Sequence, residues 1–183
     1  ATAGTVGKNK KVQALKIRLR GQEYTGDIKY SVKAGGEDWQ KDVISNEIAG
    51  TVGENKYLEA VKVELTGEMK EQYNIYYRVH LSDIGWLDWA VNGNLAGNEG
   101  YNKKIEAIQI QLVKKNGAAP GNTDNPYLVK VADIVYQAHV QDIGWQKEVE
   151  NGTIAGTTGK NKQLEAVKIK LDNQSVSGSI QYR

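Results

Sequence analysis

The chain has 183 residues, with 24 lysines and arginines against 22 aspartates and glutamates, and therefore a formal net charge of +2. This near balance argues against a dedicated nucleic-acid-binding protein, which usually carries a strong basic excess. No apolar run is long enough to cross a membrane, so we expect no membrane insertion. The N-terminal residues lack the apolar stretch of a signal peptide, but a mature secreted protein looks the same.

The sequence lacks the residues that most enzyme signatures require. It has no cysteine and only two histidines, His80 and His139. This composition excludes disulfides, thiol nucleophiles, zinc ribbons and iron–sulfur sites. The HExxH zinc motif and the GxSxG nucleophile motif are also absent. We therefore expect no catalytic residue, no metal and no cofactor, and the protein is predicted not to be an enzyme.

An Ala-Gly motif occurs four times along the chain, and internal repeats of this kind decide the fold. We call these pairs AG segments and number the four copies in chain order. Their glycines are Gly4, Gly50, Gly97 and Gly156. An eight-residue run follows each one, and we call these runs the long strands: 12–19, 58–65, 105–112 and 164–171.

Apolar side chains alternate with polar ones along each long strand, which is the period of a half-buried β-strand. A second alternating run follows each long strand, around 28–32, 75–79, 134–138 and 180–182. Polar stretches that contain glycine separate the two runs. We therefore predict that each long strand forms an antiparallel hairpin with the run that follows it.

A tryptophan segment completes the repeat in three of the four copies, at Trp39, Trp86 and Trp145. The chain thus holds about three and a half units of roughly 47 residues. We expect one repeat-built domain over 1–183, made of a partial unit at 1–30 and full units at 31–78, 79–137 and 138–183.

The third unit contains an insertion at 114–133, which holds both prolines of the chain, Pro120 and Pro126. This composition is typical of a loop. The repeat resumes in register on both sides, so we favour a decorated loop within one domain. The alternative is two modules, 1–113 and 127–183, joined by a linker.

We expect an all-β fold, because no segment shows a convincing amphipathic helix. A unit of this size cannot bury its apolar face alone, so the units must pack on one another. Our leading interpretation is a β-trefoil-like, pseudo-threefold assembly of hairpins, because closure also removes exposed sheet edges. The alternatives are a β-prism and a linear array of hairpin repeats. The extra half unit at the N-terminus fits the threefold interpretation poorly.

The last unit reads HVQDIGW at 139–145, then Asn151-Gly152, then AGTTGKNKQLEAVKIKL at 155–171. It resembles the ChW family, the clostridial hydrophobic repeats with a Gly-Trp pair. The match covers the chain outside the insertion. The repeat at 31–78 departs most, because Lys33 replaces the histidine and Asp38 replaces the glycine before tryptophan. The resemblance implies a secreted or cell-surface protein of Gram-positive bacteria with a non-catalytic role in adhesion or in binding polysaccharide or protein.

The tryptophans are the first candidate ligand-binding residues, because an exposed indole can stack on a sugar ring. Trp39, Trp86 and Trp145 occur once per unit, so a role in holding the units together is the stronger interpretation for them. Trp89 has no counterpart in the other units and is the better candidate for an exposed contact, with a local packing role as an equal alternative.

Charged residues that recur in each unit are the second group of candidates. Glu59, Glu106 and Glu165 are in phase with the apolar face, so each needs a partner such as Lys33, His80 or His139. We favour a structural link between loop and strand over a ligand pocket that includes Asp83 or Asp142. By phase, His80 and His139 are predicted on the solvent-exposed face, where histidine can make a pH-sensitive contact.

The resulting hypothesis is a secreted or cell-surface module that recognises a polysaccharide or surface glycoprotein through shallow repeated sites and gains strength by multivalency. The alternative is a structural or assembly repeat that contacts proteins, including other copies of itself, without reading sugar. A third hypothesis, glycoside hydrolysis by a carboxylate pair such as Asp83 and Glu99, is the weakest of the three.

Overall fold

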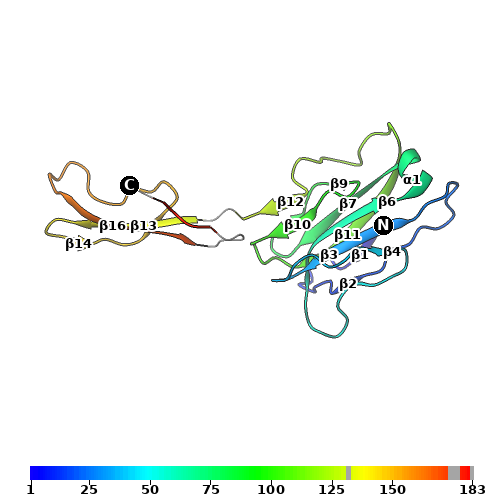
Figure 1. Ribbon diagram of the computed structural model, residues 1–183, viewed down its shortest axis with the longest axis horizontal. Coiled ribbons are helices and arrows are strands. Elements are labelled where there is room, and N and C mark those ends of the chain that lie inside the picture. The colour runs from blue at the N-terminus through cyan, green and yellow to red at the C-terminus, as the bar shows by residue number, and fades with distance from the viewer. Residues whose placement is uncertain (131–132, 173–177, 182–183) are drawn as a thin grey trace. The chain divides into compact units, whose positions relative to one another are not determined.

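A computed structural model describes residues 1–130, 133–172 and 178–181 of the chain. The chain divides into two compact units, unit 1 at Ala1–Val129 and unit 2 at Lys130–Arg183 (Figure 1). This division differs from the single domain that the repeat predicted. Most of the insertion belongs to unit 1.

The prediction of an all-β fold is confirmed. The described residues contain one short helix, α1 (Gly67–Gln72), which the sequence did not predict. The strands are β1 (Thr2–Gly4), β2 (Ala14–Leu15), β3 (Ile28–Ala34), β4 (Val43–Ile44), β5 (Ala49–Gly50), β6 (Leu58–Leu65), β7 (Tyr73–Leu81), β8 (Gly85–Trp86), β9 (Ala90–Val91), β10 (Ala96–Glu99), β11 (Ile105–Lys114), β12 (Tyr127–Val129), β13 (Asp133–Val140), β14 (Gly144–Trp145), β15 (Val149–Glu150) and β16 (Leu164–Asp172).

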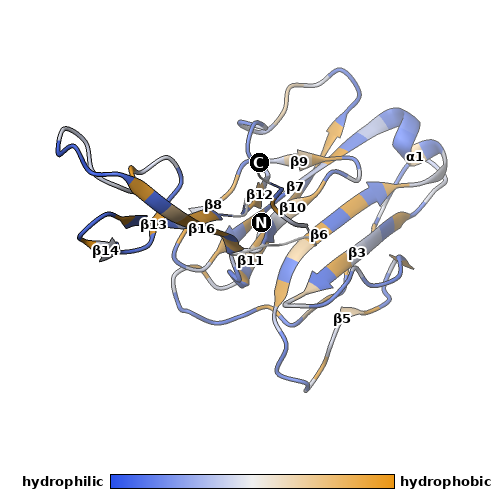
Figure 2. Ribbon diagram, turned by 60° about the vertical axis from the view of Figure 1, so that its left-hand side comes forward, coloured by the Kyte–Doolittle hydropathy of each residue, from blue (hydrophilic) through white to orange (hydrophobic). Residues whose placement is uncertain are grey.

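Three long hairpins form the framework, and their pairing corrects the sequence prediction. The long strands of copies 2, 3 and 4 each pair with the run that precedes them, not with the run that follows: β3 with β6, β7 with β11, and β13 with β16. The tryptophan and AG segments therefore lie between the two strands of each hairpin. Orange and blue alternate along β3 and β6 in Figure 2, as the period of two requires. The last predicted run, at 180–182, ends outside the described residues.

The AG segments join the first three copies into a cycle. The AG segment of copy 2 pairs with the long strand of copy 1 (β5 with β2), and that of copy 3 pairs with copy 2 (β10 with β6). The AG segment of copy 1 pairs with the long strand of copy 3 (β1 with β11). The N-terminal half unit thus closes the cycle. This pairing is not that of a linear array and is compatible with a trefoil-like assembly, although the strands form no closed barrel.

The glycine of each AG segment allows this close approach. Gly4, Gly50 and Gly97 all have positive φ. A Cβ on any of them would lie under 3.0 Å from a backbone carbonyl oxygen of the neighbouring copy. Only glycine combines that conformation with that contact.

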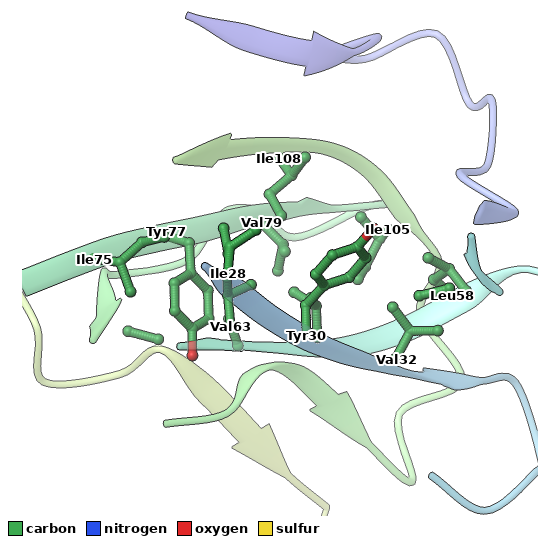
Figure 3. Packing of buried hydrophobic residues seen from close by; sticks show 14 of the residues in the cluster. Ile28, Tyr30, Val32, Leu58, Val63, Ile75, Tyr77, Val79, Ile105 and Ile108 are labelled. Atoms are coloured by element: carbon green, nitrogen blue, oxygen red, sulfur yellow. The ribbon is translucent and has the colours of Figure 1, made fainter. Parts of the chain in front are cut away.

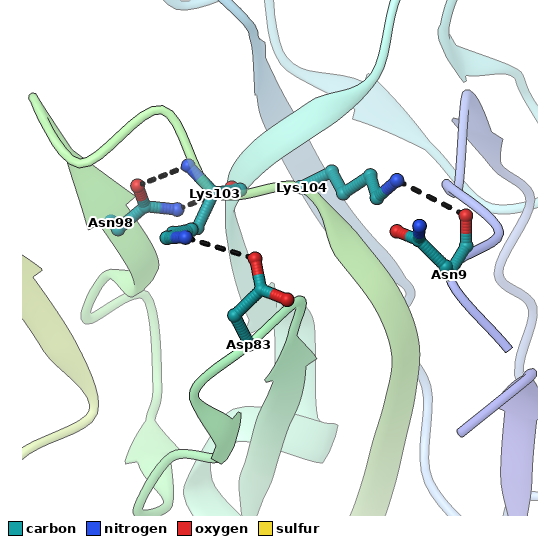
Figure 4. A network of polar contacts seen from close by, with 5 residues as sticks. All are labelled: Asn9, Asp83, Asn98, Lys103 and Lys104. Atoms are coloured by element: carbon teal, nitrogen blue, oxygen red, sulfur yellow. Dashed lines mark hydrogen bonds and ion pairs between the residues drawn. The ribbon is translucent and has the colours of Figure 1, made fainter. Parts of the chain in front are cut away.

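Hydrogen bonds near the start of the long strands reinforce the cycle. The Val12 amide donates to the Ile105 carbonyl at 2.7 Å, and the Leu58 amide donates to the Val12 carbonyl at 2.9 Å. The Lys104 ammonium donates to the Asn9 carbonyl at 3.0 Å, again joining copy 3 to copy 1 (Figure 4).

The core of unit 1 lies between the hairpins that this cycle brings together (Figure 3). Tyr30 and Tyr77 occupy equivalent positions on β3 and β7 and are fully buried. Their hydroxyls donate to the carbonyl oxygens of Glu47 and Asn94, so each ring is buried with its polar atom satisfied. The equivalent Tyr136 of unit 2 makes the same bond but is only half-buried.

Candidate functional site: the repeated tryptophan clusters

Each repeated tryptophan lies directly opposite the basic residue that the sequence singled out. Trp86 pairs across the strands with His80, and Trp145 pairs with His139. Trp39 forms an isolated bridge with Lys33. In two copies the turn between the paired positions contains an aspartate with positive φ, as that tight turn requires. Phase along one strand could not predict these pairs, because they depend on this turn.

In unit 1 the Trp86 cluster is a packed assembly of aromatic and charged groups. The His80 and Trp86 rings meet edge to face with centroids 5.4 Å apart. The Arg78 guanidinium lies over both Trp86 and Trp89, at 4.9 and 4.8 Å from the ring centroids. The cation is attracted to the faces of both rings and covers indole surface, and Trp86 is only half-exposed.

In unit 2 the equivalent cluster is open to solvent. The His139 and Trp145 ring centroids are 5.2 Å apart, and Lys168 Nζ lies 4.2 Å from the indole centroid. Trp145 is nevertheless 42% exposed, because Gln137 and Glu148 stand where unit 1 has Arg78 and Trp89. Trp39 is intermediate, with Lys62 Nζ at 5.6 Å.

In two copies the glutamate and its histidine partner join two strands of one hairpin, instead of the loop and strand that were predicted. Glu106 is buried, and its Oε2 lies 3.2 Å from His80 Nδ1, without hydrogen-bond geometry. In unit 2, Glu165 Oε2 lies 2.8 Å from His139 Nδ1 with hydrogen-bond geometry. The prediction that both histidines lie on the solvent face is wrong for His80, whose side chain is only 12% exposed. The paired tryptophan and glutamate cover that histidine.

The third carboxylate, Glu59, is buried without such a partner. Lys33 binds Glu99 at 2.5 Å, and the side-chain donor to Glu59 among the described residues is the Tyr57 hydroxyl, 3.4 Å away. Burial raises the pKa of Glu59, and the backbone of Gly36 and the charge of Lys33 offset this only in part. Copy 1 has Gln13 at the equivalent position, which needs no desolvated charge.

We therefore expect Glu59→Gln to stabilise unit 1 at neutral pH, because the amide keeps the hydrogen bonds without a buried charge. A raised carboxyl pKa costs stability above that pKa, and the cost disappears as the pH falls through it and Glu59 is protonated in the folded state. The gain should accordingly vanish below the ordinary Glu value of 4.5. Urea unfolding of the unmodified chain and of Glu59→Gln at pH 7 and pH 4 measures this gain. A loss of stability in Glu59→Gln at pH 7 contradicts the claim that the buried charge of Glu59 is unfavourable.

The aspartates of the turn are exposed but paired. Asp83 binds Lys103 at 2.9 Å (Figure 4). Asp142 binds Lys162 at 2.7 Å, so each tryptophan turn is tied to the loop after the AG segment. The Lys103 ammonium lowers the pKa of Asp83, and Lys33 lowers the pKa of Glu99. A glycosidase needs one carboxyl group with a raised pKa as its general acid, and this pair does not provide it.

Trp89 corrects the prediction of an exposed contact. Its side chain is only 7% exposed, because the insertion covers it. The Trp89 amide donates to the Asn122 carbonyl at 2.8 Å, and Gly121 lies against the indole. Asp88 accepts hydrogen bonds from the Asn122 side chain and the Asn125 amide, at 3.1 and 2.9 Å. The insertion is thus a structured part of unit 1, anchored on Trp89, the tryptophan that has no counterpart in the other repeats.

A cavity of about 420 Å³ lies near the ends of the hairpins of unit 1, and no sequence pattern predicted it. Its apolar wall includes Met69 from α1 and Tyr73 from β7. Arg18 and Arg20, two of the four arginines of the chain, line it with polar groups. It forms where the loop at 17–23 replaces a paired strand.

In the part of the chain that the structure describes, the one helix, α1, lacks the length and apolar character needed to span a membrane. Within the same residues, no group of three or more histidine and acidic side chains is arranged to hold a metal ion.

The fold and the recurring clusters define a β-structured repeat module in which each full copy contributes a tryptophan turn. The family model described as Clostridial hydrophobic W, ChW, matches three stretches, residues 35–67, 80–114 and 139–173. These stretches make up more than half of the chain, which therefore belongs to the ChW family. Each match starts near the turn before a tryptophan and contains the long strand that follows. No curated protein and no solved structure matches the chain.

Proposed function

We propose that this protein is a non-catalytic, secreted or cell-surface adhesion module that binds a polysaccharide or surface glycoprotein through its tryptophan clusters. The observation that carries the proposal is Trp145, a large indole that stays 42% exposed beside Lys168 and His139. A flat apolar ring flanked by hydrogen-bonding groups is suited to stack on a sugar ring.

The repetition of the cluster supports the same proposal. Trp86 presents a second, more covered indole with the same histidine partner, and Trp39 presents a third with lysine. Shallow sites of this kind bind weakly one at a time, but several sites on one chain increase the affinity for a repetitive polymer.

Trp145→Ala is the direct test, in pull-down assays with insoluble cellulose, chitin and purified Gram-positive cell wall. We expect about tenfold weaker binding to the retained polymer, the equivalent of about 1.4 kcal/mol. The matched control is Ile143→Ala, because Ile143 is similarly exposed, at 49%, two residues away. Both variants should fold, since neither side chain is buried.

Binding that is equal for Trp145→Ala and Ile143→Ala contradicts the role of the indole. Failure of the unmodified protein to bind any of these polymers favours the second candidate function, a structural or assembly repeat that contacts proteins. The observation favouring that alternative is the uncovered strand face of unit 2.

A further inference from the structure

The long strand of unit 2 exposes a face that unit 1 buries. Leu164 and Val167 on β16 are 60% and 44% exposed, whereas the equivalent Leu58 and Val61 on β6 are fully buried. The sequences are nearly the same, LEAVKIKL and LEAVKVEL, so the difference comes from the surroundings. In unit 1 the AG segment of the next copy covers this position.

Unit 2 also carries the complementary half of that contact. Gly156 has a φ of 118°, close to the 106° of Gly50. A Cβ on Gly50 would collide with the long strand of copy 1, but no described atom lies within 4 Å of the corresponding position at Gly156. The AG segment of unit 2 therefore has the conformation for pairing and, among the described residues, no strand paired with it.

Unit 2 has little core of its own. In its described residues the buried apolar side chains are Val135, Ala138 and Val140. A hairpin of this size gains stability when a neighbour covers its apolar face. Unit 2 carries seven basic and six acidic residues, so its net charge does not oppose contact between identical chains.

We propose that three copies of this chain associate through unit 2, with the AG segment of each copy paired antiparallel to β16 of the next. The register of unit 1 sets the AG glycine opposite the alanine of the long strand. In the same register Gly156 faces Ala166, and Ala155 faces Val167 of the next copy.

The number of chains follows from unit 1, where the same contact runs head to tail from one repeat to the next and closes after three repeats. A head-to-tail contact whose rotation closes gives a ring. Unit 1 itself is not the occupant, because all three of its AG segments and their long strands are already paired with one another. The occupant that we propose is the same face of a second and a third chain.

Sedimentation equilibrium of the full chain over a range of concentrations tests the association. We expect a species of three times the 20.2 kDa chain mass that dissociates to monomer on dilution. Val167→Lys and Leu164→Asp should remain monomeric, with unchanged circular dichroism because both side chains are exposed. Ile143→Lys is the matched control and should still assemble, because the equivalent Ile84 of unit 1 stays 43% exposed within the closed cycle.

Cysteine cross-linking tests the register, since the chain has no cysteine of its own. Directly opposite residues of antiparallel strands lie within disulfide range. Oxidation of the Ala155→Cys, Val167→Cys double variant should give a covalent trimer, and the Ala155→Cys, Ile143→Cys pair should not. A monomer at every concentration, a dimer as the largest species, or a trimer that Val167→Lys leaves intact overturns the proposal. None of these outcomes depends on polysaccharide binding.

Discussion

Gly50→Ala is expected to destabilise unit 1 by more than about 3 kcal/mol, the sum of an unfavourable backbone conformation and a collision in a packed region. Gly50 has a φ of 106°, where any residue with a Cβ is strained. Its Cβ would in addition meet the Gln13 carbonyl and the Ala14 backbone of the paired strand. The collision pushes β5 off β2 and opens the cycle of copies.

Gly156→Ala is the matched control for this substitution. It imposes the same strain, at a φ of 118°, but meets no described atom within 4 Å. We expect a loss in unit 2 of about 1 to 2 kcal/mol, from strain alone. Urea unfolding followed by NMR signals of each unit, at concentrations where the chain is monomeric, separates the two effects. Equal losses would mean that the close approach at Gly50 contributes nothing.

Trp89→Ala is expected to cost unit 1 about 3 to 5 kcal/mol, as is usual when a buried tryptophan is truncated. The indole lies under the insertion and beneath the Arg78 guanidinium, so its removal leaves a cavity and frees the covering segment. Cleavage by trypsin at Lys114 and Lys115 should become faster, because the chain after them loses its anchor.

Trp145→Ala provides the comparison, because its indole is exposed and its loss should cost less than about 1 kcal/mol. Urea unfolding and the time course of trypsin digestion measure both variants. If Trp89→Ala unfolds at the same urea concentration as the unmodified chain, the insertion is not anchored on this residue.

The sequence was sufficient to predict the strands, because alternation along 58–65 and 105–112 reports directly which side chains are buried. It did not predict which strands pair. A period of two defines a buried face but not the neighbour that covers it. The hairpin pairs β6 with β3, which precedes it, and the tryptophan and AG segments lie between those two strands in the sequence.

The candidate site could be predicted in its parts but not in its exposure. The recurring tryptophan, histidine and glutamate of copies 3 and 4 do contact one another. Their exposure differs between Trp86 and Trp145, since it depends on Arg78 and Trp89, which copy 4 lacks. Likewise, LEAV is buried at 58–61 and exposed at 164–167, because burial requires a partner from another copy.

The central structural claim is that the N-terminal half unit closes a cycle of three copies, and amide hydrogen exchange followed by NMR tests it most directly. The Thr5 amide donates to the Glu106 carbonyl at 3.0 Å, and the Val12 amide donates to the Ile105 carbonyl at 2.7 Å. We predict that both amides exchange as slowly as those of β7 and are exposed together with them in urea. Exchange of Thr5 and Val12 at the rates of an unfolded chain, while β7 stays protected, would contradict the closed cycle.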